Sequence, residues 1–311
     1  MKRISVSYEH PPYGVYPCIT ARMFHNFNLW MPMPIWPMES NNDIENGDMN
    51  TVGWRKYGRS INNSKKVKCL ACSIEDDVGE ITREAAQCLQ AFFEELKDNT
   101  SIESFNFDIA LSTTISASDM RHFFRNNYKL RSISISIGQQ ISVAQCANVA
   151  TAMRYVFVDK FIIKGQLGVH SNNEAFRRLM PACQTVKKLS LCYLEENDHF
   201  TAVAELLRNS TTLIQEIELN IYDSPNLDIA SAENELIESL IQNSHLKRLN
   251  TGLFRGVRDM ERFKTVLCDT TSLASVCQSN HILEHITVNG RDFCTSVQNI
   301  SSSTKYPTKG R

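Results

Sequence analysis

The order of apolar and polar positions along this chain repeats with a fixed period. A short pattern, apolar-x-x-apolar-x-apolar, recurs along most of the sequence, and the four successive intervals between Ile102 and Ile214 are each 28 residues long. A fixed period of this kind is typical of solenoids, in which each repeat is one supersecondary unit. The copies begin at Val67, Ile102, Leu130, Val158, Val186, Ile214, Leu246 and Leu283.

The repeated pattern predicts a short β-strand in every copy. Its last two apolar positions are two residues apart, the spacing that places side chains on one face of a strand, and its first position precedes a bend. With a hydrophobic content of 42%, chance would fill about ten of the 24 apolar positions, whereas 23 are filled and only Thr251 departs from the pattern.

Each predicted strand is followed by a predicted helix, because apolar residues there recur three and four positions apart. Residues of types that cap helix N-termini mark the expected starts, at Thr82, Ser118, Ser142, Asn173, Asp198 and Ser231. Asparagines mark the expected ends, where they would tolerate a left-handed backbone, at Asn63, Asn99, Asn127, Asn209, Asn243 and Asn280.

Stacking of these strand-helix repeats predicts an α/β solenoid. A strand and a helix alone cannot cover each other's apolar sides, so neighbouring copies must build one continuous core. Strands in a sheet lie about 4.8 Å apart and packed helices about 8 to 10 Å apart, so the array must curve. We therefore expect about eight repeats that form a curved parallel sheet on the inside, with helices on the outside.

The pattern resembles the leucine-rich repeat family in its longer, ribonuclease-inhibitor-like subtype, over about residues 52–295. The resemblance implies strand-helix repeats and a role in protein recognition. Two strings, Leu267–Leu273 and Ser279–Leu283, resemble a group of uncharacterised algal proteins of this family, of the diatom type. The chain lacks the family's Asn or Cys after the strand, since those positions hold Glu75, Ala110, Gly138, Gln166, Leu194, Tyr222, Phe254 and Arg291.

Three segments are expected along the chain. Residues 1–50 contain six prolines and a polar run, and we expect them to be irregular or disordered. Within them, Trp30–Met38 could cap the first repeat, lie loose as a tail, or act as a docking peptide. Residues 51–296 would form one leucine-rich repeat domain, and residues 297–311 a flexible tail.

Composition narrows the range of partners. The net charge of −1 supplies no long-range attraction to nucleic acids or to anionic membranes. No apolar signal-peptide core follows Lys2 and Arg3, and no stretch of about 18 apolar residues could span a bilayer. The ten cysteines are scattered, several of them at apolar positions of the repeat, so we expect a reducing, intracellular and cytoplasmic setting.

Candidate chemistry is sparse. Cys69 and Cys72 are three residues apart in a predicted strand and would point to opposite faces, which disfavours a metal or redox site. His281 and His285, near Cys277, have helical spacing, yet His285 falls in a predicted strand. We therefore expect no catalytic residue, metal or cofactor.

The positions that alternate with the buried ones should face the inside of the arc. They are mostly polar or small, and Lys188 and Glu216 should lie side by side, with Arg248 next to Glu216. The alternative is a solvated face with internal ion pairs. The predicted residues that bind a partner protein on this concave face are Lys160, Lys164, Lys188, Tyr193, Glu216, Glu218 and Arg248.

The sequence thus favours a non-enzymatic protein-protein interaction scaffold, and the step from repeat array to binding rests on the family resemblance. One alternative is a regulator of an enzyme, such as a GTPase activator of the Ran type, although no positioned Arg and Asn pair supports it. Another is a structural array without a specific partner.

Overall fold

The computed structural model divides the chain into two compact units. Unit 1 comprises Met1–Gly165 with His170–Ala182, and unit 2 comprises Gln166–Val169 with Cys183–Arg311. A single repeat domain over residues 51–296 stays a prediction. The structure describes residues 3–7, 18–22, 51–64, 67–75, 83–137, 142–154, 156–164, 173–222, 224–253, 283–288 and 291–292.

Strands and helices alternate in both units. Unit 1 contains β1 (Arg3–Ser7), β2 (Cys18–Arg22), α1 (Thr51–Asn63), β3 (Cys69–Glu75), α2 (Arg83–Leu96), β4 (Ser104–Asp108), the 3-10 helix η1 (Ile109–Thr113), α3 (Ala117–Asn126), β5 (Ser132–Ser136), α4 (Val143–Met153), β6 (Lys160–Lys164) and α5 (Asn173–Leu179). The 3-10 helix η2 (Met180–Cys183) begins in unit 1, and its last residue, Cys183, belongs to unit 2. Unit 2 contains β7 (Lys188–Leu194), α6 (Asn197–Arg208), β8 (Glu216–Ile221), α7 (Ile229–Gln242), β9 (Arg248–Thr251), β10 (His285–Val288) and β11 (Arg291–Asp292).

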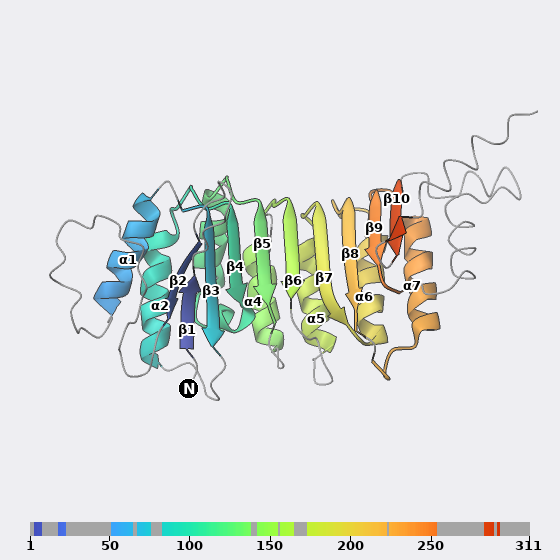
Figure 1. Cartoon of the computed structure of the whole chain (residues 1–311), viewed down its shortest axis with the longest axis horizontal. Coiled ribbons are helices and arrows are strands. Elements are labelled where there is room, and N and C mark those ends of the chain that lie inside the picture. The colour runs from blue at the N-terminus through green and yellow to red at the C-terminus, as the bar shows by residue number, and fades with distance from the viewer. Residues whose placement is uncertain are drawn as a thin grey trace, which may run out of the picture. The chain divides into compact units, whose positions relative to one another are not determined.

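The predicted α/β alternation with a parallel sheet is confirmed in each unit. Strands β3 to β6 of unit 1 pair in parallel and in sequence order, as do β7 to β10 of unit 2, and the helices lie on one side of the strands (Figure 1). The middle apolar positions of the repeats stand opposite one another and are at most 2% exposed, so they form the core. These residues are Leu70, Phe105, Ile133 and Phe161 in unit 1, and Leu189, Ile217, Leu249 and Ile286 in unit 2.

The N-terminal segment differs from its prediction, because β1 and β2 lie within residues 1–50, which the sequence predicts to be irregular. Strand β1 pairs antiparallel with both β2 and β3, and β2 begins parallel to β3. Ile4 and Val6 alternate with polar residues, a strand pattern that lies outside the 28-residue repeat. The pairing covers the edge of β3, which would otherwise expose unpaired backbone groups. Trp30–Met38 and residues 297–311 lie outside the described residues.

Only some of the helices begin at the residues that the sequence predicts. Ser142 caps α4 as predicted: its hydroxyl accepts from the Gln145 N–H at 3.1 Å, and the Gln145 side chain accepts from the Ser142 N–H at 2.8 Å. The predictions for three other helices are wrong by two or three residues. Their caps are Ser116 instead of Ser118, Glu196 instead of Asp198, and Asp228 instead of Ser231. Ser116 and Asp228 take this role because their oxygens bind backbone N–H groups of the first turn.

Asparagines follow the helices at the predicted places, but their expected left-handed backbone is wrong. Asn127, Asn209 and Asn243 have φ values of −85°, −72° and −85°. Asn243 instead joins two repeats through the hydrogen bonds of its side-chain amide. The Asn243 Oδ1 accepts from the N–H groups of His245 at 2.9 Å and Leu246 at 2.6 Å, while its Nδ2 donates to the Leu207 carbonyl at 2.7 Å.

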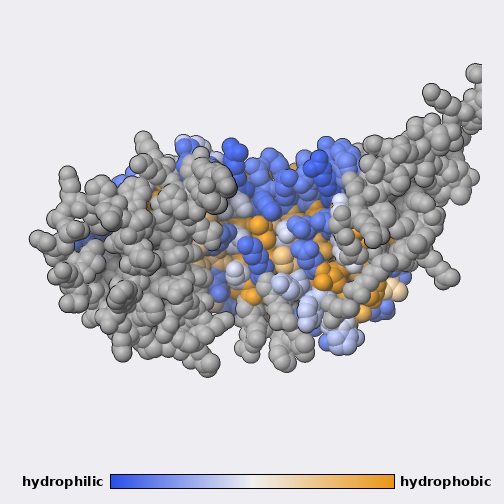
Figure 2. Space-filling view, in the orientation of Figure 1, coloured by the Kyte–Doolittle hydropathy of each residue, from blue (hydrophilic) through white to orange (hydrophobic). Residues whose placement is uncertain are grey.

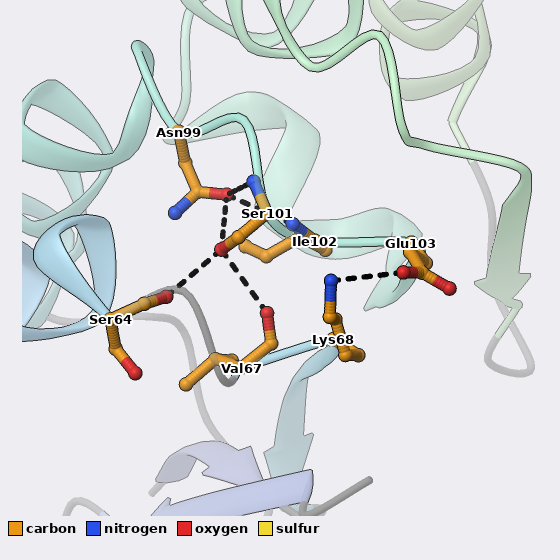
Figure 3. A network of polar contacts seen from close by, with 7 residues as sticks. All are labelled: Ser64, Val67, Lys68, Asn99, Ser101, Ile102 and Glu103. Carbon is orange, nitrogen blue, oxygen red and sulfur yellow. Dashed lines mark hydrogen bonds and ion pairs between the residues drawn. The ribbon is translucent and has the colours of Figure 1, made fainter.

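Asn99 makes the same connection in unit 1 (Figure 3). Its Oδ1 accepts from the N–H groups of Ser101 at 2.9 Å and Ile102 at 3.0 Å, and its Nδ2 donates to the Ile61 carbonyl at 3.4 Å. The Ser101 hydroxyl lies 3.0 Å from the carbonyl oxygen of Ser64, so this polar cluster satisfies backbone groups from two successive repeats.

A backbone contact recurs at the bend before each strand. The Lys68 carbonyl accepts from the N–H groups of both Glu103 and Ser104, at 2.6 and 2.9 Å. The Lys187 carbonyl does the same for Gln215 and Glu216, at 2.8 and 3.0 Å. These paired bonds hold neighbouring strands in the register that the repeated apolar pattern predicts.

Candidate functional site

The side of the strands away from the helices carries the residues that the sequence proposes as a site. We call the outward positions of β3 to β6 the strand face of unit 1, and those of β7 to β10 the strand face of unit 2. Figure 2, which looks onto this side, shows hydrophilic residues interspersed with hydrophobic ones where the described residues are visible. Of the seven predicted residues, Lys160 and Lys164 belong to unit 1 and the other five to unit 2.

The predicted ion pairs of unit 2 are confirmed. The Lys188 Nζ lies 2.6 Å from Glu216 Oε2, and the Arg248 guanidinium lies 3.2 Å from Glu216 Oε1. Register places the three residues opposite one another on β7, β8 and β9. The side chains of Lys188 and Arg248 are 49% and 56% exposed, so each pair adds only about 0.2 to 1 kcal/mol to stability. Glu216 therefore neutralises part of the positive charge of Lys188 and Arg248 but adds little to the stability of the fold.

Glu218 has a different environment. It is half-buried beside Ser190, whose hydroxyl donates to its Oε2 at 3.2 Å. Ser190 is only 6% exposed although it occupies an outward position. Among the described residues, no Lys, Arg or His lies within ion-pair distance of the Glu218 carboxylate. The carboxylate thus keeps a charge that a binding partner could neutralise.

Tyr193 lies at the end of β7, in a β-bulge. Leu191 pairs with Leu219 and Leu194 pairs with Ile221, so β7 has one more residue than β8 in this stretch. Tyr193 has a φ of 64° and is 47% exposed. Its ring lies next to that of Tyr222, with centroids 6.4 Å apart.

Tyr222 is a candidate that the sequence reasoning missed. Tyr222 is eight residues after Ile214 and lies beyond the apolar-x-x-apolar-x-apolar pattern, which ends at Leu219. The alternation of Glu216, Glu218 and Asn220 continues to Tyr222, so the period-two pattern could have found it.

The two lysines of unit 1 stand on β6, opposite serines of β5. Register pairs Lys160 with Ser132 and Lys164 with Ser136. Neither ammonium group has an ion pair with any residue that the structure describes. At four residues' separation on one strand, the two charges are about 13 Å apart. They leave the strand face of unit 1 positively charged at β6.

A buried polar pair follows β7. Glu195 is 2% exposed and His199 is fully buried, and the His199 Nδ1 accepts from the Glu195 N–H at 3.4 Å. Burial lowers the pKa of His199 to about 4 and, with the nearby charge of Glu196, raises the pKa of the Glu195 carboxyl. The Glu195 Oε1 has no hydrogen-bond partner in the described part of the chain. Burial thus favours the neutral forms of both groups.

The cysteine and metal candidates give no site in the described residues. Cys69 is partly exposed and Cys72 buried, as expected for opposite strand faces, and neither forms a disulfide. Burial raises the pKa of the Cys72 thiol, which makes it a poor nucleophile. No group of three or more His, Cys, Asp or Glu residues in the described ranges could hold a metal ion. Cys277 and His281 lie outside them.

No helix in the described ranges combines the length and apolar character needed to cross a bilayer. No family model matches the chain, and no curated protein matches it either.

Proposed function

We propose that this chain is a scaffold for protein-protein interaction, in which the two units are consecutive parts of one leucine-rich repeat array and the strand faces bind a partner protein. One observation carries the proposal. Helices cover one side of the strands in each unit (Figure 1), and register places polar and charged residues opposite one another on the other side. Such ordered rows suit the recognition of a partner's backbone and charges.

The distribution of charge supports the same function. Exposed ion pairs such as Lys188–Glu216 contribute little to the stability of the fold. Stability alone therefore does not explain why charged residues occupy these outward strand positions. Lys160 and Lys164 supply charge without a partner in the described residues, which adds attraction for carboxylates of another protein. The buried free thiols of Cys72 and Cys183 are in keeping with an intracellular location.

Affinity capture from the native cell tests the proposal. The bait would be the full chain, compared with a strand-face variant that carries Lys160→Glu, Lys164→Glu and Arg248→Glu. A matched control carries Arg55→Glu, Arg59→Glu and Arg178→Glu, three exposed helix positions with the same total change in charge.

We expect the strand-face variant to lose proteins that both the wild type and the control retain, at low and moderate salt. If the strand-face variant and the wild type capture the same proteins in the same amounts, the strand faces are not the binding surface. Circular dichroism of all three proteins would verify that each one is folded.

A further inference from the structure

An exposed aromatic pair stands on the strand face of unit 2, at the C-terminal ends of β7 and β8. Tyr193 and Tyr222 are 47% and 45% exposed, and their ring planes are inclined at 48° with centroids 6.4 Å apart. Tyrosine is among the residues that most often dominate binding energy at protein interfaces. The faces of its ring also attract cations.

The backbone at Tyr193 is arranged to expose this ring. In a regular strand, Tyr193 would follow the inward positions of Leu189 and Leu191 and would point into the core. The bulge places Leu194 in the core instead, where it is fully buried, and turns Tyr193 outward. Tyr193 is the one non-glycine residue of the described chain with a positive φ. A bulky residue is disfavoured in this conformation, whereas glycine or asparagine is not.

The described charged residues that follow β7 and β8 are acidic. The sequence contains no Lys or Arg between Lys188 and Arg208, nor between Arg208 and Lys247. The C-terminal ends of β7 and β8 and the residues just beyond them therefore supply carboxylates alone. Those carboxylates in the described chain are Glu196, Asp198 and Asp228, whereas Glu195 is buried and favours its neutral form.

Glu218 extends the negative charge onto the strand face itself. Its carboxylate accepts from the Ser190 hydroxyl and has no ion pair with a described residue, whereas Glu216 is neutralised by Lys188 and Arg248. Glu218 lies on β8 and Tyr222 directly follows that strand, and their separation of four residues corresponds to about 13 Å. An extended peptide spans the same distance with four residues.

Building on the proposed function, we propose that Tyr193, Tyr222 and Glu218 bind an extended segment of the partner protein that carries arginine or lysine. One cationic side chain packs against the tyrosine rings, near the carboxylates that follow β7. A second cationic side chain four residues away pairs with Glu218. The partner's segment thus has basic residues at positions i and i+4 and lies along β8.

Selection of random peptides displayed on phage tests this specificity. The full-length wild type would be compared with a variant carrying Tyr193→Asn and Tyr222→Ser. Asparagine tolerates the left-handed backbone at position 193, so the fold is kept. The control is Tyr128→Ser in unit 1, which removes a tyrosine that is 75% exposed.

We expect the peptides that bind the wild type and the control, but not the double variant, to be enriched in arginine and lysine with i, i+4 spacing. In synthetic copies of these peptides, replacing arginine with neutral citrulline should weaken binding about tenfold. Glu218→Gln should weaken binding about threefold to tenfold and reduce its salt dependence.

Three results would overturn the inference: selected peptides without basic residues, equal binding to the wild type and the double variant, or no selected peptides at all. A different experiment tests the proposed function. Affinity capture uses Lys160, Lys164 and Arg248, none of which belongs to the tyrosine site. A captured protein that depends on those residues, together with a failed peptide selection, would reject the cationic segment alone.

Discussion

The side chain of Asn243 offers the sharpest test of how the repeats are held together. Replacing it with alanine removes three hydrogen bonds, to the N–H groups of His245 and Leu246 and to the Leu207 carbonyl, all at 2.6 to 2.9 Å. Asn243 is 5% exposed, so water replaces these partners poorly. Each buried backbone group left without a partner costs about 1 to 3 kcal/mol.

Three such groups at the lower end of that range give a loss of about 3 kcal/mol in the free energy of unfolding of unit 2. Unit 2 spans 133 residues, so each kcal/mol shifts its Tm by about 3 to 4 °C and we expect a decrease of about 9 to 12 °C. Asn243→Asp should fall between alanine and the wild type. Its oxygen still accepts from both N–H groups, but it cannot donate to Leu207.

Asn127→Ala is the matched control. Asn127 occupies the equivalent position of another repeat and is 1% exposed, yet neither polar atom of its amide has a hydrogen-bond partner in the described residues. Its removal relieves two unsatisfied groups, so we expect a change below about 1 kcal/mol in either direction.

The assay is thermal unfolding followed by far-ultraviolet circular dichroism, with hydrogen exchange of residues 244–251 as a local measure because the two units could melt separately. Equal Tm values for Asn243→Ala and Asn127→Ala, with unchanged protection of β9, would refute the reasoning.

Three other predictions concern unit 2. Leu189→Asp places a carboxylate at a core position that is 1% exposed and should abolish the cooperative unfolding transition of unit 2; an unchanged denaturant melt would contradict the core assignment. The low pKa of His199 means that the unfolded chain takes up a proton first, so stability is complete above about pH 6.5 and decreases by about 3 kcal/mol towards pH 4. His199→Asn, with Glu195 present in both proteins, should flatten the profile of Tm against pH between about pH 6.5 and pH 4. An equally steep profile would show that His199 does not cause the loss of stability. Tyr193→Asn should raise stability by about 1 kcal/mol in urea unfolding, because it relieves the left-handed strain; a loss would show that the ring stabilises the fold.

The strands of the repeats were predictable because their signal is periodic. Residues such as Phe105 and Ile133 are opposite each other in the sheet since the same spacing recurs in each copy. Cross-strand neighbours followed from the same register, and this is why the contacts of Glu216 with Lys188 and Arg248 could be named in advance.

Features that belong to a single repeat were not predictable in this way. The bulge at Tyr193 breaks the alternation by one residue, and no composition signal marks it, since glycine is absent there. The strands β1 and β2 lie outside the repeat and depend on pairing with β3. The positions of the asparagines at helix ends were predictable, but their role was not. Their amide hydrogen bonds reach across repeats and therefore depend on where the helix of the preceding copy lies.

The paired bonds at the bends join each strand only to the one before it. Lys68 binds residues of β4 and the bend before it, Glu103 binds Arg131 and Ser132, and the Arg131 carbonyl binds Lys160. These three junctions all use a backbone carbonyl and backbone N–H groups, whatever side chains flank them. A segment of 28 residues could therefore be duplicated or deleted within unit 1, because the flanking chain would again meet equivalent backbone partners. The chain can thus gain or lose whole repeats during evolution.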